Sequence, residues 1–148
     1  MVHRTKVKEI HRLLTTPSVI EEGASPREVV TGILANPKTR ALYVIDDDKK
    51  LAGIIVLKNI LKSAFLESIP EPYLSFSALM HIKPGAKTAK NLMIPPVYAK
   101  EEDIIKDAFI RMTTNDLEEI PVVDDNLKVI GDLNMLEILN FWKERAEE

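Results

Sequence analysis

Cysteine is absent from this 148-residue chain, and the absence excludes several kinds of chemistry. Without cysteine there can be no disulfide, no thiol nucleophile and no thiolate metal site. Histidine is scarce, with three residues, and none stands four residues from another, the spacing by which two helical histidines bind one metal. We therefore expect neither a catalytic centre based on histidine nor a metal site.

Long apolar runs and a strong charge of one sign are also missing. The longest apolar run, Leu51 to Leu57, falls far short of the ~20 residues that a membrane-spanning helix needs. The first residues lack the apolar core of a signal peptide. The 20 Lys and Arg against 23 Asp and Glu give a net charge of −3, whereas nucleic-acid binders depend on neutralising phosphates. We expect a cytoplasmic globular protein that binds neither membrane nor nucleic acid.

An internal repeat is the clearest feature that is present. When the sequence is shifted by 78 positions, Val44 falls on Val122 and Gly53 falls on Gly131. The matches extend without a gap from position 14 to position 61, and they fall at apolar and turn positions that a fold constrains. The repeat divides the chain into a lead-in helix (1–12), a first repeat (13–66), a connector (67–90) and a second repeat (91–148).

Each repeat has the pattern of a β-α-β-β-α unit. Strands are predicted at 18–20 and 96–98, followed by helices that begin after the N-cap Ser25 and after 102–103. Hairpins follow with aspartate-rich turns at 46–48 and 124–125, which we interpret as turn formers rather than metal ligands. The closing helices carry apolar stripes, which in the second repeat comprise Met135, Ile138, Leu139 and Trp142. We interpret Trp142 as a residue of the core or of a dimer interface.

The predicted fold class is α+β, with two β-α-β-β-α repeats packed about a pseudo-two-fold axis. One unit of about fifty residues buries too little apolar surface to be stable alone, so two units would share a core.

Two sequence segments, Leu42 to Leu61 and Ile120 to Leu139, resemble the CBS domain, a family named after cystathionine β-synthase. The resemblance rests on the strand and turn Pro-Val-Val-Asp that begins at Pro121, on Gly131, and on a helix that starts four to six residues after this glycine. Tandem pairs of the domain are called Bateman modules. The resemblance implies a non-catalytic regulatory module that binds AMP, ADP, ATP or S-adenosylmethionine in clefts between the repeats.

The resemblance also implies a mechanism and partners. A bound ligand would favour one relative orientation of the repeats, and an unknown partner protein would sense that orientation. We expect a homodimer, no enzymatic activity and no cofactor other than this regulatory ligand. The alternative is a structural dimerisation or interaction module whose clefts are degenerate and empty.

Family members bind the ribose with a segment that reads Gly-x-x-Thr/Ser-x-x-Asp, and both repeats depart from it. The first repeat has Val56 and Asn59 at the last two positions, and the second has Asn134 and Glu137. Glu137 keeps the charge that strengthens hydrogen bonds to a diol, and Asn134 can both donate and accept. The resemblance therefore favours the second repeat as the ribose site.

Charge favours the first repeat for a phosphate, because Arg40 precedes its second strand where the second repeat has Glu118 and Glu119. The second site should therefore prefer a ligand with little negative charge, such as adenosine or S-adenosylmethionine, or require a cation. The resemblance further implies an adenine wall, for which the candidates are Thr16, Val19, Ala41 and Tyr43 in the first repeat and Ile94, Val97, Ile120 and Pro121 in the second.

Overall fold

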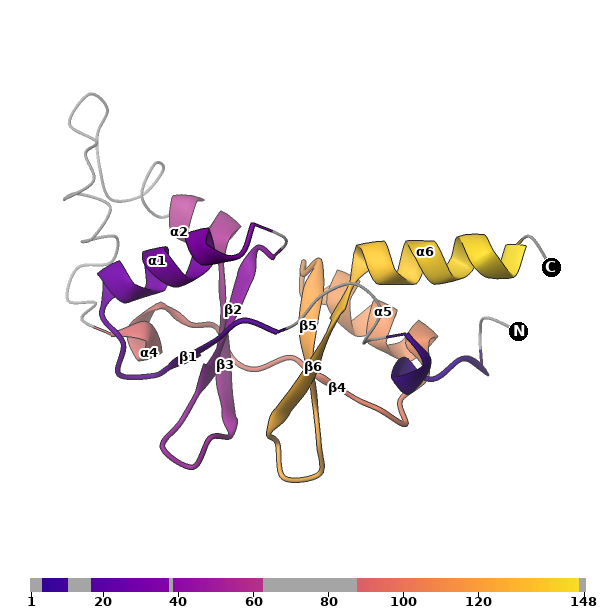
Figure 1. Ribbon diagram of the computed structural model, residues 1–148, viewed down its shortest axis with the longest axis horizontal. Helices are drawn as coiled ribbons and strands as arrows, with labels where there is room; N and C mark the ends of the chain where they lie inside the picture. The colour runs from indigo at the N-terminus through magenta and orange to yellow at the C-terminus, as the bar shows by residue number, and fades with distance from the viewer. Residues whose placement is uncertain (1–3, 11–16, 38, 63–87, 147–148) are drawn as a thin grey trace. The chain divides into compact units, whose positions relative to one another are not determined.

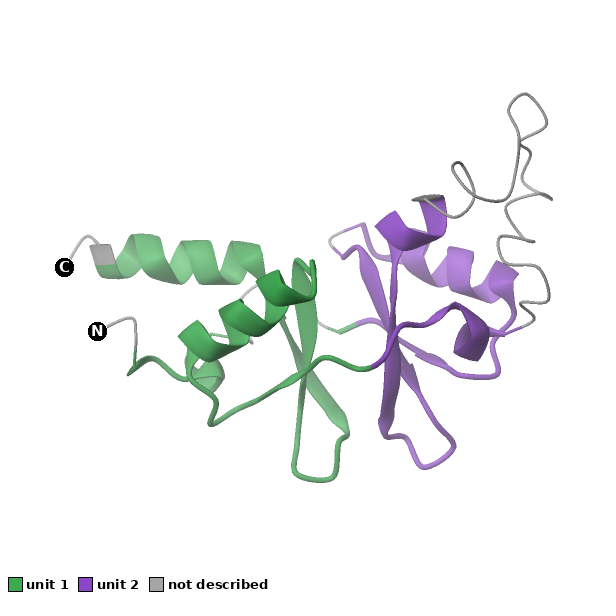
Figure 2. Cartoon of the chain, turned by 180° about the vertical axis from the view of Figure 1, so that it is seen from behind, with its two compact units in different colours: residues 1–17, 96–148 green, residues 18–95 purple. Residues whose placement is uncertain are grey.

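The computed structural model of the chain describes residues 4–10, 17–37, 39–62 and 88–146. These residues form two compact units (Figure 2). One unit comprises Met1–Pro17 together with Pro96–Glu148, and the other comprises Ser18–Pro95. The first of these units thus contains most of the predicted second repeat, from residue 96 onward, and the other contains most of the predicted first repeat.

The unit of the first repeat has a three-stranded sheet in the order β1-β2-β3. Strand β1 is parallel to β2, which is antiparallel to β3. Helix α1 connects β1 to β2, and α2 follows β3 directly (Figure 1). The elements are β1 (Val19–Glu21), α1 (Pro26–Ala35), β2 (Ala41–Ile45), β3 (Leu51–Val56), α2 (Leu57–Lys62) and α4 (Ala89–Leu92).

The unit of the second repeat has the same topology, with sheet order β4-β5-β6 and the same strand directions. Its elements are β4 (Ala99–Lys100), α5 (Ile105–Thr114), β5 (Glu119–Val123), β6 (Val129–Asn134) and α6 (Met135–Ala146). The predicted α+β class and the duplicated β-α-β-β-α unit are therefore confirmed. The strand predicted at 96–98 is wrong in position, because β4 begins at Ala99.

Local sequence accounts for the ends of helix α1. Ser25 caps the helix by accepting from the Glu28 amide at 3.1 Å, while Glu28 accepts from the Ser25 amide at 3.3 Å. Pro26 occupies the first helical position, where its missing N–H costs no hydrogen bond. The helix ends at Ala35, before Asn36 and Pro37, as the sequence predicts.

The two hairpins have the same turn. The Asp46 carboxylate accepts from the amides of Asp48 and Lys50, and the Asp124 carboxylate accepts from two amides at the equivalent positions. One residue of each turn, Lys49 or Leu127, has positive φ. These aspartates hold the turns, which is the role that the sequence predicts for them.

The ungapped alignment of the repeats at an offset of 78 is wrong for the first strand and helix of each. Ile20 pairs with Val44, whereas Ala99 pairs with Val122, so Ile20 corresponds to Ala99 at an offset of 79. The hairpins keep the offset of 78. The difference arises because five residues separate α1 from β2 and four separate α5 from β5. Apolar periodicity tolerates a loop shorter by one residue, so the alignment could not detect it.

The core of the first repeat lies between its sheet and its helices. Leu42, Val44 and Ile55 from the sheet pack in one cluster with Val29 and Ile33 of α1. Ala89 and Leu92 of α4 join the same cluster, so the end of the predicted connector and the first residues of the predicted second repeat pack with the first repeat.

The N-terminal segment belongs to the unit of the second repeat. The Val7 amide donates to Asp103 O at 2.8 Å, and the Ile105 amide donates to Thr5 O at 2.8 Å. Val7 and Ile10 are fully buried. The helix predicted in this part of the chain is a short 3₁₀ helix, Val7–Glu9. We call residues 4–10 the N-terminal strap.

The Glu102 carboxylate binds the strap through two hydrogen bonds, which it accepts from Lys6 Nζ at 2.6 Å and from Lys8 Nζ at 2.7 Å. These hydrogen bonds, that from Lys6 first, lower the pKa of the Glu102 carboxyl from 4.5 to about 2. The charged form of Glu102 is therefore the form that favours the docked strap.

Acid should loosen the strap. A carboxyl whose pKa is lowered by folding contributes stability that is complete above its unfolded pKa and is lost as the pH falls through the folded pKa, here from 4.5 towards about 2. We expect the protection of the Val7 amide against hydrogen exchange to fall over this range. In Glu102→Gln, which has no charge to lose, the fall should be smaller. Equal falls in the two proteins would contradict this role of Glu102.

The stripe predicted for the closing helix of the second repeat is partly wrong. Met135 and Ile138 are half-buried, but Leu139 and Trp142 are 57% and 56% exposed, so Trp142 is not a core residue. Phe141 is buried instead. In the first repeat, Ile60 of α2 is buried as predicted and Leu57 is half-buried, but Leu61 is 41% exposed, and the last two residues of that stripe, Ala64 and Phe65, lie outside the described residues.

Candidate functional site

The junction of β6 and α6 brings together the two residues predicted to bind ribose. Asn134 is the last residue of β6, and Glu137 lies in the first turn of α6. The Asn134 Oδ1 atom accepts from the Glu137 amide at 2.9 Å, and Glu137 Oε1 accepts from the Asn134 amide at 3.2 Å. This reciprocal pair is a capping box, so both side chains have fixed positions at the helix N-terminus.

One face of the second repeat's sheet is polar at the same end. Asn134 lies opposite Glu119, and Asp132 lies opposite Pro121, so these four side chains share a face. Asn134 Nδ2 lies 3.5 Å from Asp132 Oδ2. Glu119, Asp132 and Glu137 are all buried. The site therefore contains three buried carboxylic acids, and Ile120 lies on the opposite, apolar face of β5.

The corresponding part of the first repeat is apolar and open. Ala41 of β2 lies opposite Val56 of β3, and neither side chain can donate or accept a hydrogen bond. Asn59, the counterpart of Glu137, is exposed. Arg40 is exposed as well, and its Nη1 atom donates to the carbonyls of Pro37 and Thr39 in the loop that precedes β2.

The structure does not bring all predicted site residues together. Ile94, predicted for the second site, lies in the unit of the first repeat. Its amide donates to Ile54 O at 2.8 Å, and its carbonyl accepts from the Ile54 amide at 3.1 Å. Thr16 lies outside the described residues.

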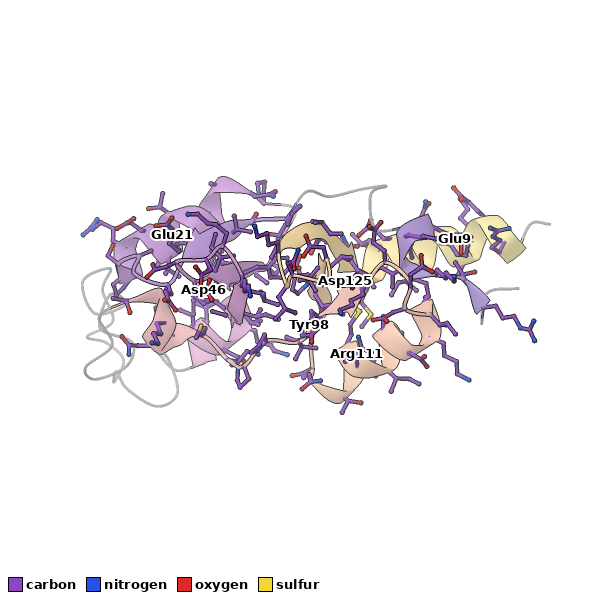
Figure 3. The ribbon with its side chains drawn as sticks, turned by 90° about the horizontal axis from the view of Figure 1, so that it is seen from below. Glu9, Glu21, Asp46, Tyr98, Arg111 and Asp125 are labelled. Atoms are coloured by element: carbon purple, nitrogen blue, oxygen red, sulfur yellow. The ribbon has the colours of Figure 1, made fainter. Side chains whose placement is uncertain are left out.

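Val97 lines an open groove of about 460 Å³ beside strand β4. We call this the β4 groove; it is lined by residues 96–98 and by Lys100, Asp103, Arg111 and Asn115. Arg111 Nη1 donates to Tyr98 O at 2.6 Å and to Asp103 Oδ2 at 3.2 Å. Figure 3 labels Tyr98 and Arg111, two of the residues that line this groove.

The first repeat has a groove beside strand β1, the β1 groove, of about 550 Å³, which shares three equivalent lining positions with the β4 groove, Val19, Glu21 and Ala24. It is lined by residues 19–21, 23, 24, Glu28 and Ile45. Its charged lining residues are acidic, and Glu21 forms an ion pair with Lys49 at 2.8 Å. The hydrogen bond and charge of Lys49 lower the pKa of the Glu21 carboxyl. The two grooves thus differ in the sign of their charge.

Sequence reasoning missed Asp132 and Arg111. Asp132 stands two positions before Asn134 on a predicted strand, so strand alternation alone could have placed it on the same face. Arg111 offered no local signal, because its partner Tyr98 lies thirteen residues away in an irregular segment.

Two searches of the described residues are negative. They contain no group of three or more histidine, cysteine, aspartate or glutamate residues placed to hold a metal ion. In this same part of the chain, the helices are too short or too polar for any of them to cross a membrane.

Comparisons with known proteins agree with the duplicated topology. The model of the CBS domain family matches residues 7–65 and again residues 89–144. The chain belongs to the CBS domain family and carries a tandem pair of the domain. A search of the curated proteins finds no match for this chain.

Solved structures of CBS proteins share the fold over almost the whole chain. A CBS domain-containing protein from Thermotoga maritima is 35% identical, with a TM-score of 0.75 over 95% of this chain and 96% of that one. The CBS-pair protein CBSX2 in complex with AMP is 21% identical, with a TM-score of 0.72 over 94% and 97%. The CBS domain pair of protein MJ0100 in complex with 5′-methylthioadenosine and S-adenosyl-L-methionine is 22% identical, with a TM-score of 0.70 over 95% and 98%.

Proposed function

We propose that this chain is a non-catalytic regulatory module that binds an adenosine-containing ligand and signals to a partner protein. The observation that carries the proposal is the Asn134–Glu137 pair, whose side chains are fixed at the N-terminus of α6 where the family binds ribose. The ligands named for two structures of the same fold, AMP for one and S-adenosyl-L-methionine with 5′-methylthioadenosine for the other, support an adenosine ligand. Such a ligand shifts the equilibrium between two conformations of the module only if it binds one conformation more tightly than the other.

The charge of the site favours a ligand without phosphate. Glu119, Asp132 and Glu137 are buried at one end of the same sheet, where solvent screens a charge weakly. Any of these carboxyl groups that is ionised would repel a phosphate and attract the sulfonium and ammonium groups of S-adenosylmethionine. We propose that the second repeat binds S-adenosylmethionine or 5′-methylthioadenosine more tightly than it binds ATP.

Calorimetric titration of the two ribose positions tests the site. Glu137→Gln keeps an acceptor for the Asn134 amide but removes the charge, so the helix cap should survive. We expect this variant to weaken binding of S-adenosylmethionine by about tenfold, since a charge-assisted hydrogen bond contributes ~1.5–3 kcal/mol. Asn59→Ala, the matched change in the first repeat, should weaken it by less than about threefold, because the exposed amide carries no charge.

The reverse ranking of the two variants would refute the choice of repeat. Thermal unfolding with each ligand separates this function from the alternative, an interaction module with empty sites. A ligand at 100 times its dissociation constant adds about 2.7 kcal/mol of stability. If AMP, ATP, 5′-methylthioadenosine and S-adenosylmethionine all leave the melting temperature unchanged at millimolar concentration, the alternative holds.

We also propose that the chain forms a homodimer through helix α6. Leu136, Leu139 and Trp142 lie at spacings of three on this helix, and each is more than half exposed. A row of large apolar side chains on one helix face is typical of a surface that is covered in the assembled protein. The equivalent helix faces of two copies could cover one another, since a two-fold interface uses the same patch on both subunits.

Sedimentation of charged variants tests the dimer. We expect the 16.7 kDa chain to sediment as a dimer at micromolar concentration, and Leu139→Glu to sediment as a monomer, because an unpaired charge is costly in a buried interface. Leu34→Glu, a change at an exposed leucine of α1, should leave the mass unchanged. A wild-type chain that is monomeric throughout this range would contradict the proposal.

A further inference from the structure

We propose that the β4 groove is a second binding site, specific for a small ligand that carries a carboxylate or phosphate group. Its volume of about 460 Å³ lies in the range of small-molecule sites. It lies beside the edge strand β4 and helix α5, and its polar side chains are different from the Asn134–Glu137 pair.

The guanidinium of Arg111 is fixed in position before any ligand arrives. Its Nη1 atom donates to Tyr98 O and to Asp103 Oδ2, and Asp103 Oδ2 in turn accepts from the Lys100 amide at 2.9 Å. Both bonds of Arg111 use the same nitrogen atom, so Nη2 and Nε keep their hydrogens for other acceptors. The side chain of Arg111 is 38% exposed, which leaves the guanidinium within reach of a ligand. A planar, pre-positioned guanidinium is the group that best binds the two oxygens of a carboxylate or phosphate.

Lys100 supplies a second, adjustable positive charge to the groove. Its Nζ atom lies 3.4 Å from Asp125 Oδ1. Asp125 belongs to the hairpin turn and is labelled in Figure 3, and its side chain is 97% exposed. An exposed pair of this length contributes little energy, so a ligand oxyanion can compete with Asp125 for the ammonium. Once a ligand replaces Asp125 as the partner of Lys100, the lining residues Lys100, Arg111 and Asp103 carry one net positive charge, which favours an anionic ligand.

The first repeat shows that the fold does not require this arrangement. Arg111 is the seventh residue of the ten-residue helix α5, and the seventh residue of α1 is Gly32. Lys100 corresponds to Glu21, so the β1 groove is acidic where the β4 groove is basic. The first repeat folds with the same strand order without either cation. The two cations are therefore particular to the second repeat.

Titration of the full chain with two simple anions, followed by ¹H–¹⁵N NMR at constant ionic strength, tests the site. Inorganic phosphate and succinate are the probes, and each is titrated separately. The anion whose chemical-shift changes saturate at the lower concentration identifies the preferred oxyanion. We expect saturable shifts at the amides of Tyr98, Lys100 and Asn115. Arg111→Met should raise the dissociation constant at least about tenfold, and Lys143→Gln, which removes a cation from α6, should leave it unchanged.

Because Arg111 also holds Tyr98 O, its loss could disturb the fold of this unit. Lys100→Gln keeps that contact and should still weaken binding about threefold, as expected for one exposed charge. Shifts that rise linearly without saturation, or dissociation constants that are equal in wild type and Arg111→Met, would overturn the proposal. Saturable binding in the wild type, lost in Arg111→Met and kept in Glu137→Gln, supports it independently of the adenosine site.

Discussion

A methyl group added at Gly53 should lower the free energy of unfolding by about 3–5 kcal/mol. The Cβ of an alanine would lie 2.6 Å from the carbonyl oxygen of Ile94 and 2.5 Å from Met93 Sδ. The Met93 side chain can turn away, but Ile94 O is a backbone atom that accepts from the Ile54 amide at 3.1 Å. Moving it breaks the bridge between Ile54 and Ile94, so the cost combines overpacking of ~1–3 kcal/mol with two hydrogen bonds of ~1 kcal/mol each.

Residue-specific hydrogen exchange is the suitable measurement for Gly53→Ala, because a chain of two compact units need not unfold in one step. We expect the Ile94 amide and the amides of β3 to lose protection. Gly23→Ala is the matched control, since nothing lies within 4 Å of a Cβ at that position. It should change the stability by no more than about 0.5 kcal/mol. Unaltered protection of the Ile94 amide in Gly53→Ala would contradict the prediction, because it would show that the backbone accommodates the methyl group without losing the bridge to Ile54.

The hairpins and helix starts were predictable because their determinants are local. An aspartate at the first turn position can accept hydrogen bonds from the amides that follow it, and both hairpins form as predicted. Ser25 with Pro26 fixes the start of α1 in the same way. The offset between the repeats was not predictable, because it depends on a loop shorter by one residue.

The features that could not be predicted from the sequence depend on contacts between segments that are distant in the chain. The Asn134–Glu137 pair was found because its two members stand three residues apart in a known motif. The β4 groove depends on Arg111 reaching a carbonyl thirteen residues earlier, and the strap depends on pairing across about ninety-six residues. Periodicity also left open whether Trp142 of α6 lies in the core or on the surface, because Leu139 and Trp142 satisfy the same spacing as buried residues do.

Ile10→Ala should destabilise the unit of the second repeat by about 3 kcal/mol, although residue 10 precedes the first repeat in the sequence. Ile10 is fully buried, and removing three carbon atoms from a buried isoleucine costs ~2–5 kcal/mol, depending on how far the cavity collapses. The strap's ion pairs to Glu102 are largely exposed and contribute little, and its backbone hydrogen bonds to residues 101, 103 and 105 contribute only ~1 kcal/mol each. Its attachment therefore depends mainly on the burial of Val7 and Ile10.

The location of the effect distinguishes this prediction from a general loss of stability. In Ile10→Ala we expect faster hydrogen exchange at the amides of β5 and β6 and at the Val7 amide, with little change in β2, because β2 belongs to the other unit. Lys8→Gln is a change at the exposed neighbour of Val7. It should lower the free energy of opening at these amides by less than the ~1 kcal/mol that a surface ion pair contributes. An equal loss in both sheets, or a loss confined to β2 and β3, would show that the strap stabilises the first repeat as well or instead. Loss confined to the second repeat would show that the chain folds as an inserted first repeat within a unit formed by its two terminal segments.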